Sequence, residues 1–165
     1  MKIRLLMFIF AVPLLLVGCN RANVDVERNP DGGFNITATL NEAEVNTAIE
    51  NALAQSANPL LRDPQVDLQT GQIIINGQHD RRDGGGTVSG SVTVTLSVQN
   101  GALAAQITQA DVEGLDLTDE RIADFNTRLA EGLARLAEND RGLITVQSIT
   151  VTADNLQIVF TAQRQ

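Results

Sequence analysis

His79 is the only imidazole in the chain, so any acid–base or nucleophilic site that needs a histidine would have to be built around it. Asp80 and Asp83 follow closely and serines occur elsewhere, so a Ser-His-Asp triad is compatible with the composition. There is no G-x-S-x-G motif, however, and residues 78–86 (QHDRRDGGG) are typical of a charged, glycine-rich loop. We therefore interpret His79 as an exposed loop histidine and predict that the protein has no catalytic residues and is not an enzyme.

The sequence also lacks the residue patterns that are typical of metal, phosphate or nucleic-acid binding. One histidine beside flexible carboxylates does not make the closed ligand sets typical of zinc. The acidic residues between 111 and 120 lack the spacing of a calcium loop, although weak calcium binding there stays an alternative. The triple glycine at 84–86 lacks the lysine and the following helix of a phosphate loop. With 20 acidic against 12 basic residues, the chain also repels nucleic acid. We predict no metal, no cofactor and no nucleic-acid partner.

The single cysteine, Cys19, follows an apolar N-terminal stretch. Lys2 and Arg4 precede an apolar run over residues 5–17. That run is too short to cross a bilayer, which takes about 20 residues of helix, so it is typical of a signal peptide. A lone cysteine in an exported protein would otherwise be an unpaired, oxidisable thiol. Modification of Cys19 would explain why it has no partner.

The residues Leu16-Val17-Gly18-Cys19 resemble the lipobox of bacterial lipoproteins. In that family a diacylglyceryl group is attached to the cysteine thiol, the signal is removed before it, and the new amino terminus is often acylated as well, with chains such as palmitate. The resemblance implies that residues 1–18 are a lipoprotein signal peptide and that Cys19 is the lipidation site. It also implies an extracytoplasmic protein, anchored to a bacterial membrane through Cys19. The alternative is an ordinary secretory signal with an incidental cysteine.

The rest of the chain divides into a polar segment and one domain. Residues 19–33 contain Pro30 and end in Asp-Gly-Gly, and we interpret them as a polar tether that reaches at most roughly 50 Å when extended. An edge strand through Val24 and Val26 is an alternative within that segment. Residues 34–165 are long enough to bury one core, and we expect them to form a single α+β domain.

Two helices are predicted in this domain. Asn41 and Glu44 have the spacing of a capping box, and the helix they begin should end near Ala57. Thr118 is the predicted N-cap of a second helix that ends near Asn139. Apolar residues recur at helical spacing in both segments, so each helix should bury one face. In the second helix this apolar stripe consists of Ile122, Phe125, Leu129, Leu133 and Leu136.

Alternating apolar residues predict antiparallel strands. The plainest alternation covers residues 88–98, Asn100-Gly101 predicts a hairpin turn, and residues 103–107 alternate on the matching face. A change of phase at Gln147-Ser148 predicts a bulge in a final hairpin. We therefore predict an α+β fold in which a curved antiparallel sheet carries both helices on its apolar face.

From Leu40 onward the chain also resembles small bacterial lipid-binding proteins of the tubular lipid-binding (TULIP) type, in particular the DUF2993/LmeA-like family. The similar segments are the capped helix start LNEAEVN, the strands VDLQTGQIIING and VSGSVTVTLSV, and NGAL followed by DVEGL, over roughly residues 34–139. The resemblance implies a curved sheet around a long helix with an acyl chain in the trough. The short second strand and the terminal hairpin depart from this pattern.

These observations favour a lipid-anchored cell-envelope protein that binds or chaperones a lipid or other apolar ligand between the second helix and the sheet. The same apolar residues would equally form a filled core. The alternative function is a ligand-free structural module, or one that binds a protein or glycan at the envelope surface. The residues predicted to contact the ligand are Ile122, Phe125, Leu129, Leu133, Val92, Val94, Leu96, Leu103 and Ile107.

Overall fold

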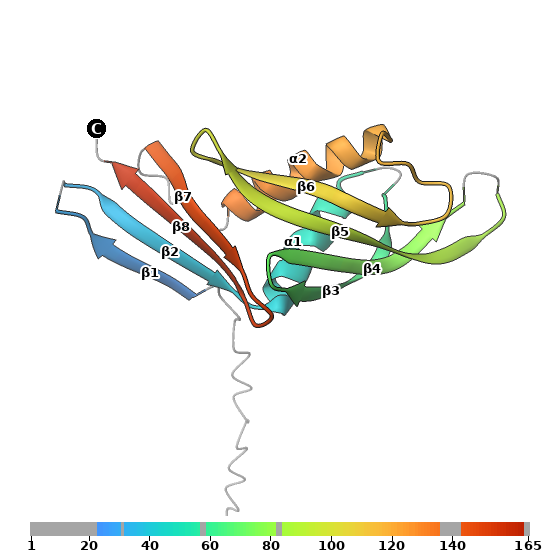
Figure 1. Cartoon of the computed structure of the whole chain (residues 1–165), viewed down its shortest axis with the longest axis horizontal. Helices are drawn as coiled ribbons and strands as arrows, with labels where there is room; N and C mark the ends of the chain where they lie inside the picture. Colours follow the sequence, from blue (N-terminus) through green and yellow to red (C-terminus); the bar gives the residue numbers. More distant parts are fainter. Residues whose placement is uncertain (1–22, 31, 57–58, 82–83, 136–142, 164–165) are drawn as a thin grey trace, which may run out of the picture.

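The computed structural model describes residues 23–30, 32–56, 59–81, 84–135 and 143–163, which form eight strands and two helices. This confirms the predicted α+β fold of antiparallel strands (Figure 1). In chain order the elements are β1 (Asn23–Arg28), β2 (Phe34–Leu40), α1 (Glu42–Ala54), β3 (Arg62–Gln69), β4 (Gln72–Asp80), β5 (Thr87–Gln99), β6 (Ala102–Asp111), α2 (Glu120–Arg135), β7 (Leu143–Val151) and β8 (Leu156–Gln163).

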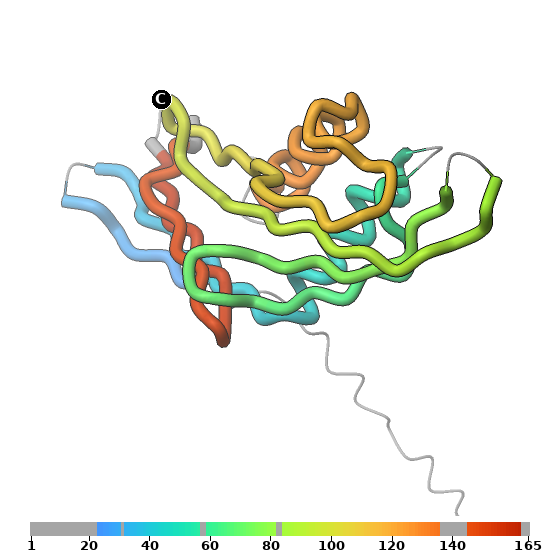
Figure 2. The backbone as a smooth tube through the Cα atoms, turned by 45° about the vertical axis from the view of Figure 1, so that its right-hand side comes forward, coloured from blue at the N-terminus to red at the C-terminus, as the bar shows by residue number. Residues whose placement is uncertain are grey.

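The strands form two four-stranded sheets rather than one. The order β1-β2-β8-β7 makes the terminal sheet, and β3-β4-β5-β6 makes the central sheet. In the terminal sheet, β2 near the start of the chain pairs with β8 at its end. The pairing runs from Phe34 opposite Ala162 to Leu40 opposite Leu156. Figure 2 shows both helices on one side of the central sheet, with the terminal sheet beside them. The buried apolar residues of both sheets and both helices, among those described, make one core.

The helix α1 begins where the capping box predicted. The Asn41 side chain accepts a hydrogen bond of 3.0 Å from the Glu44 N–H, and the Glu44 carboxylate accepts one of 2.8 Å from the Asn41 N–H. The helix ends at Ala54, three residues before the predicted Ala57, which lies outside the described residues. Its buried face consists of Val45, Ala48, Ile49, Ala52 and Leu53.

The helix α2 is capped one residue later than predicted. The carboxylate of Asp119 accepts a hydrogen bond of 3.1 Å from the Arg121 N–H and also pairs with the Arg121 guanidinium. Thr118 instead donates its N–H and its hydroxyl to Asp116. The prediction of Thr118 as the N-cap is therefore wrong, because a carboxylate satisfies the exposed N–H groups and the positive helix end together. The predicted end near Asn139 lies outside the described residues.

Side chains of the two helices cover the outer edges of the central sheet. On the β3 edge, the N–H groups of Val66 and Leu68 donate to Asn46 and Glu42 of α1 at 3.1 and 3.3 Å. On the β6 edge, the Ile107 N–H donates to the Asn126 side chain of α2 at 3.0 Å. An uncovered edge strand has backbone groups that pair readily with another chain, so these contacts protect the central sheet.

Two predicted local features of the strands are confirmed. Asn100 and Gly101 have φ angles of 53° and 76°, the left-handed pair that a two-residue hairpin of this kind requires. The register of β7 with β8 shifts between Val146 and Ser148, where the bulge was predicted. These features depend on residues adjacent in sequence, which is why they could be read without the fold.

The prediction of a polar tether over residues 19–33 is wrong for residues 23–28. They form β1, which pairs antiparallel with β2 from Asn23 opposite Thr39 to Arg28 opposite Phe34. The edge-strand alternative through Val24 and Val26 is therefore the correct one. The turn that follows closes with a hydrogen bond of 2.8 Å from the Asn29 N–H to the Gly33 carbonyl.

Candidate apolar binding site

The residues predicted to contact a ligand lie mainly in the packed core. On α2 the described residues of the apolar stripe are buried, with Leu129 and Leu133 at 0% exposure. On β5, Val92 and Val94 are buried, while Leu96 is partly buried against the core. Side chains without exposed surface fill the space between a helix and a sheet. The structure brings the predicted residues together, and most of them form a filled core.

A pocket lies beside this core, between the next face of α2 and the first half of β6. Ala130 and Ala134 of α2 and Ala104 and Ala105 of β6 line it from two sides. Small side chains on both elements leave a volume of about 450 Å³, which is within the range of small-molecule sites. The helix is held to β6 by the hydrogen bond of Asn126, and the small side chains of Ala130 and Ala134 further along it leave space beside the strand.

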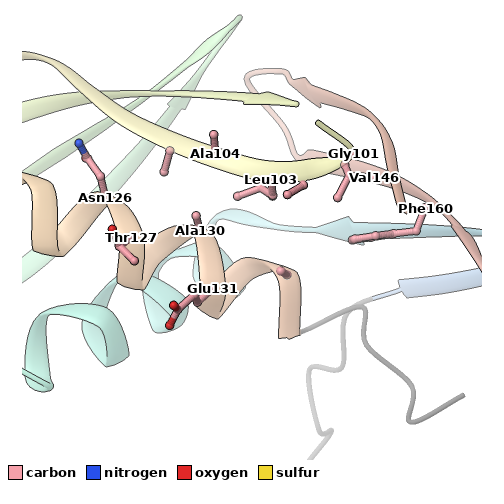
Figure 3. A pocket seen from close by; sticks show the side chains of 12 residues that line it. Gly101, Leu103, Ala104, Asn126, Thr127, Ala130, Glu131, Val146 and Phe160 are labelled. Atoms are coloured by element: carbon pink, nitrogen blue, oxygen red, sulfur yellow. The ribbon is translucent and has the colours of Figure 1, made fainter. Parts of the chain in front are cut away.

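The terminal sheet closes the pocket at one end. Val146 of β7 and Phe160 of β8 line it there, next to Gly101 of the β5–β6 turn (Figure 3). The lining is mostly apolar, and its polar members, Glu131 and Thr127 among them, lie on α2. Four elements, β6, α2, β7 and β8, therefore contribute to one apolar pocket.

Of the predicted ligand-contacting residues, Leu103 lines this pocket. Ile107 and Ile122 line a separate pocket of about 380 Å³ beside the start of α2. The others line none of the three pockets described for this part of the chain; they are Phe125, Leu129, Leu133, Val92, Val94 and Leu96.

Sequence reasoning missed most of the residues that line the apolar pocket. The alanines at 102, 104 and 105 line it from β6, and Ala130 and Ala134, four residues apart, line it from α2. The small residues on this strand and this helix were the sequence feature that could have indicated the pocket. A cavity forms where side chains are too small to fill the space between two elements. Val146 and Phe160 could not have been found this way, since only the fold brings the terminal sheet to this point.

The interpretation of His79 as an exposed loop residue is wrong. His79 is 2% exposed and lies in β4, which extends to Asp80. Period-two alternation from Ile73 and Ile75 places its ring on the core side of the sheet. Its Nδ1 is 2.9 Å from the carbonyl oxygen of Leu60, and since a carbonyl only accepts, Nδ1 carries a proton and donates. His79 has a structural role in the core.

The carboxylates near His79 and before α2 are engaged in structural contacts. Asp80 pairs with Arg62 at 2.5 Å, and Glu113 pairs with Arg81. The pKa of Asp116 is lowered because the Thr118 N–H, and then the Thr118 hydroxyl, donate to its carboxylate. Within the described ranges, no group of three or more histidine, cysteine or acidic side chains is placed to hold a metal ion.

A polar pocket of about 640 Å³ lies elsewhere, between β3 and the residues that follow β6. Its polar side chains are Asp63, Gln65, Asn76, Gln78, Ser89, Ser91, Asp111 and Glu113. Among the described residues that line it there is no aromatic ring.

The fold and pocket define an α+β domain with an apolar pocket between a helix and a strand edge. No family model, no curated protein and no solved structure matches the chain. The resemblance to the tubular lipid-binding proteins therefore stays a prediction. Cys19 and the signal peptide over residues 1–18 lie outside the described residues, so lipidation also stays a prediction. Neither described helix has the length and hydropathy to cross a membrane.

Proposed function

We propose that this protein is anchored to a bacterial envelope membrane through an acylated Cys19 and binds or chaperones a lipid, or another apolar ligand, in the pocket between α2 and β6. The observation that supports ligand binding is the pocket itself, with Leu103, Ala130 and Phe160 on three of its sides. A pocket of about 450 Å³ with such walls accommodates an apolar chain better than a hydrated molecule.

The energetics fit a carrier. Each methylene removed from water contributes about 0.8 kcal/mol, so an acyl chain is costly to expose. Movement of the chain from a bilayer into an apolar pocket is nearly neutral by comparison, because both environments are apolar. A carrier of this kind needs only modest affinity and must keep the chain out of water.

The polar groups of the lining favour certain lipid head groups. Glu131 lies on the α2 side of the pocket, and among the described residues no arginine or lysine lines it. A carboxylate repels a nearby anion and attracts a cation. We expect the ligand to be neutral at its polar end, or to carry an amine, rather than to be a free fatty-acid anion.

The direct test of ligand binding is extraction of protein purified without added lipid, followed by mass spectrometry of the organic phase. Ala130→Phe places a ring in the pocket, and Ala54→Phe makes the same change at an exposed position of α1 that lines none of the described pockets. We expect lipid to co-purify with the parent protein and with Ala54→Phe, and to be lost in Ala130→Phe. Absence of lipid from all three, together with no binding of a fluorescent acyl-chain amide, would overturn the proposal.

The anchor is tested separately. The mass of the mature protein from bacterial membranes should exceed that of the chain beginning at Cys19 by the diacylglyceryl group and any N-acyl chain. Cys19→Ala should give a protein that is recovered without detergent. An unmodified Cys19 in protein isolated from bacterial membranes would contradict the anchor. It would not bear on ligand binding in the pocket, which the lipid extraction tests.

A ligand-free interaction module remains the second proposed function, and one feature favours it. Val24 and Val26 of β1 are 40% and 52% exposed on the outermost strand of the terminal sheet. An exposed apolar edge strand is a common surface for association.

A further inference from the structure

The strand β1 is amphipathic. Side chains alternate along a strand, so Val24, Val26 and Arg28 share one face, while Asp25 and Glu27 lie on the other with Asn23. The face with the valines is thus apolar with one cation, and the opposite face is polar and acidic. All six residues are exposed.

The apolar face of β1 continues the core face of the terminal sheet. Val26 is opposite Ile36 of β2, Ile36 is opposite Phe160 of β8, and Phe160 is opposite Val146 of β7. Ile36, Phe160 and Val146 are buried, whereas Val26 is exposed. Phe160 and Val146 are also walls of the apolar pocket. The row therefore runs from the pocket wall to an uncovered apolar patch on β1.

The position of β1 in the chain limits its distance from the proposed anchor. Asn23 begins β1, and Cys19 is only four residues earlier. Four residues span at most about 14 Å even when fully extended. A tether of 15 residues would have let the domain move freely above the membrane, but the pairing of β1 with β2 removes most of that length.

We propose that β1 is a membrane-contacting strand, with Val24 and Val26 against the bilayer in which the acylated Cys19 is anchored. This proposal rests on the proposed anchor. Arg28 lies on the same face as the valines, where lipid phosphates would attract it, and the acidic Asp25 and Glu27 point away. Length of chain, apolar exposure and charge thus favour the same face. The anchored domain is then held in one orientation, and its ligand is a lipid of that leaflet.

A second copy of this chain fits the three central antiparallel registers of the same strand poorly. In antiparallel pairing of two β1 strands, a centre at Asp25 places two aspartates opposite each other, and a centre at Val26 places Asp25 opposite Glu27. Like charges directly opposite each other are destabilising. A centre between Asp25 and Val26 places charged residues opposite valines and mixes the two faces. A lipid surface is therefore the occupant that the strand favours.

The test compares neighbouring positions on opposite faces of β1. Thioether-linked Cys19 does not react with thiol reagents, so Val26→Cys or Glu27→Cys introduces a single labelling site into the mature acylated protein. Each variant is labelled with a nitroxide and reconstituted in phosphatidylcholine vesicles. Collisions with oxygen, which concentrates in lipid, and with a water-soluble nickel complex are then measured by electron spin resonance.

We expect the label at position 26 to be severalfold more accessible to oxygen than to the nickel complex, relative to the label at position 27. Equal accessibility to the nickel complex at both positions would overturn the proposal, as would dipolar broadening between labels from paired β1 strands. The mass of each variant is measured first. Loss of the acyl mass would contradict the proposed anchor, whereas an acylated protein with an aqueous label at position 26 would contradict only membrane contact by β1.

Discussion

The N–H of Val146 donates a hydrogen bond of 2.7 Å to the carbonyl oxygen of Gly101. This bond joins β7 of the terminal sheet to the β5–β6 turn of the central sheet. A second bond of 3.0 Å, from the Gly71 N–H of the β3–β4 turn to the Val151 carbonyl, joins the other hairpin tip to the same strand. Because Gly101 and Val146 also line the apolar pocket, the joint between the sheets forms one end of the candidate site.

Gly101→Ala should destabilise this joint. Gly101 has a φ of 76°, and an added Cβ would lie 2.7 Å from the Cγ2 of Thr145. The left-handed backbone costs about 1–2 kcal/mol with a side chain, and the overlap adds about 1 kcal/mol or more. We expect the free energy of unfolding, measured with urea, to fall by the sum.

Gly71→Ala is the matched control, because Gly71 has a φ of 81° but nothing within 4 Å of an added Cβ. It should show the backbone cost alone. Adding Thr145→Ser to Gly101→Ala removes the crowded methyl group and should restore about 1 kcal/mol. Equal losses for both glycines, with no recovery in the double variant, would mean that Thr145 does not crowd the turn.

Leu129→Ala should act on stability rather than on ligand binding. Leu129 is fully buried in the core and does not line the apolar pocket. Truncation of such a leucine costs about 2–5 kcal/mol. Arg128→Ala, which removes the exposed ion pair with Asp124, should cost less than about 1 kcal/mol. A Leu129→Ala protein of normal stability that no longer binds ligand would instead place the ligand against the α2 stripe.

His79→Phe should destabilise the fold because the phenyl ring cannot donate to the buried carbonyl of Leu60. An acceptor left without its partner in the core costs about 1–3 kcal/mol. Nitrogen-15 spectra of the parent protein should show the proton on Nδ1. A stable variant that lost a hydrolytic activity would contradict the structural role and would revive a catalytic one.

Asp116 should titrate below an ordinary aspartate. The pKa is lowered because the N–H and hydroxyl of Thr118 donate to the ionised carboxylate. Thr118→Val removes the hydroxyl and should raise this pKa partway, while Thr118→Ser should leave it low; carboxyl NMR shifts against pH report both. Since the folded pKa is the lower one, the stabilisation is complete above the unfolded value, about 3.9, and is lost as pH falls through the folded pKa. An unchanged pKa in Thr118→Val would assign the effect to the backbone alone.

Features set by neighbouring residues were predicted well. The capping box of Asn41 with Glu44, the Asn100-Gly101 turn and the bulge after Val146 all appear in the structure. Each depends on contacts within a few residues, so the local sequence contains the whole cause. The α+β class followed for the same reason, because hydrophobic periodicity reports which element buries a face.

Features set by distant contacts were predicted less well. The polar neighbours of His79 predict a loop, but β4 continues through it and Leu60 provides a partner from another segment. The polar composition of residues 23–28 predicts a tether, but they pair with β2. Backbone groups that are costly to leave unpaired can form hydrogen bonds with segments far away in the sequence. Short-range patterns do not show where such a partner lies.

The sequence by itself determined that this chain has two amphipathic helices, antiparallel strands with one apolar face, and a cysteine in a lipobox-like motif. Each of these features depends on the composition and hydrophobic period of a short stretch of residues. Only the tertiary structure decided that the strands divide into two sheets and that the α2 stripe is filled. It also decided that the pocket lies beside alanines, Val146 and Phe160. A cavity remains where the side chains of several elements do not fill the space between them. Whether they fill it depends on how the elements are placed.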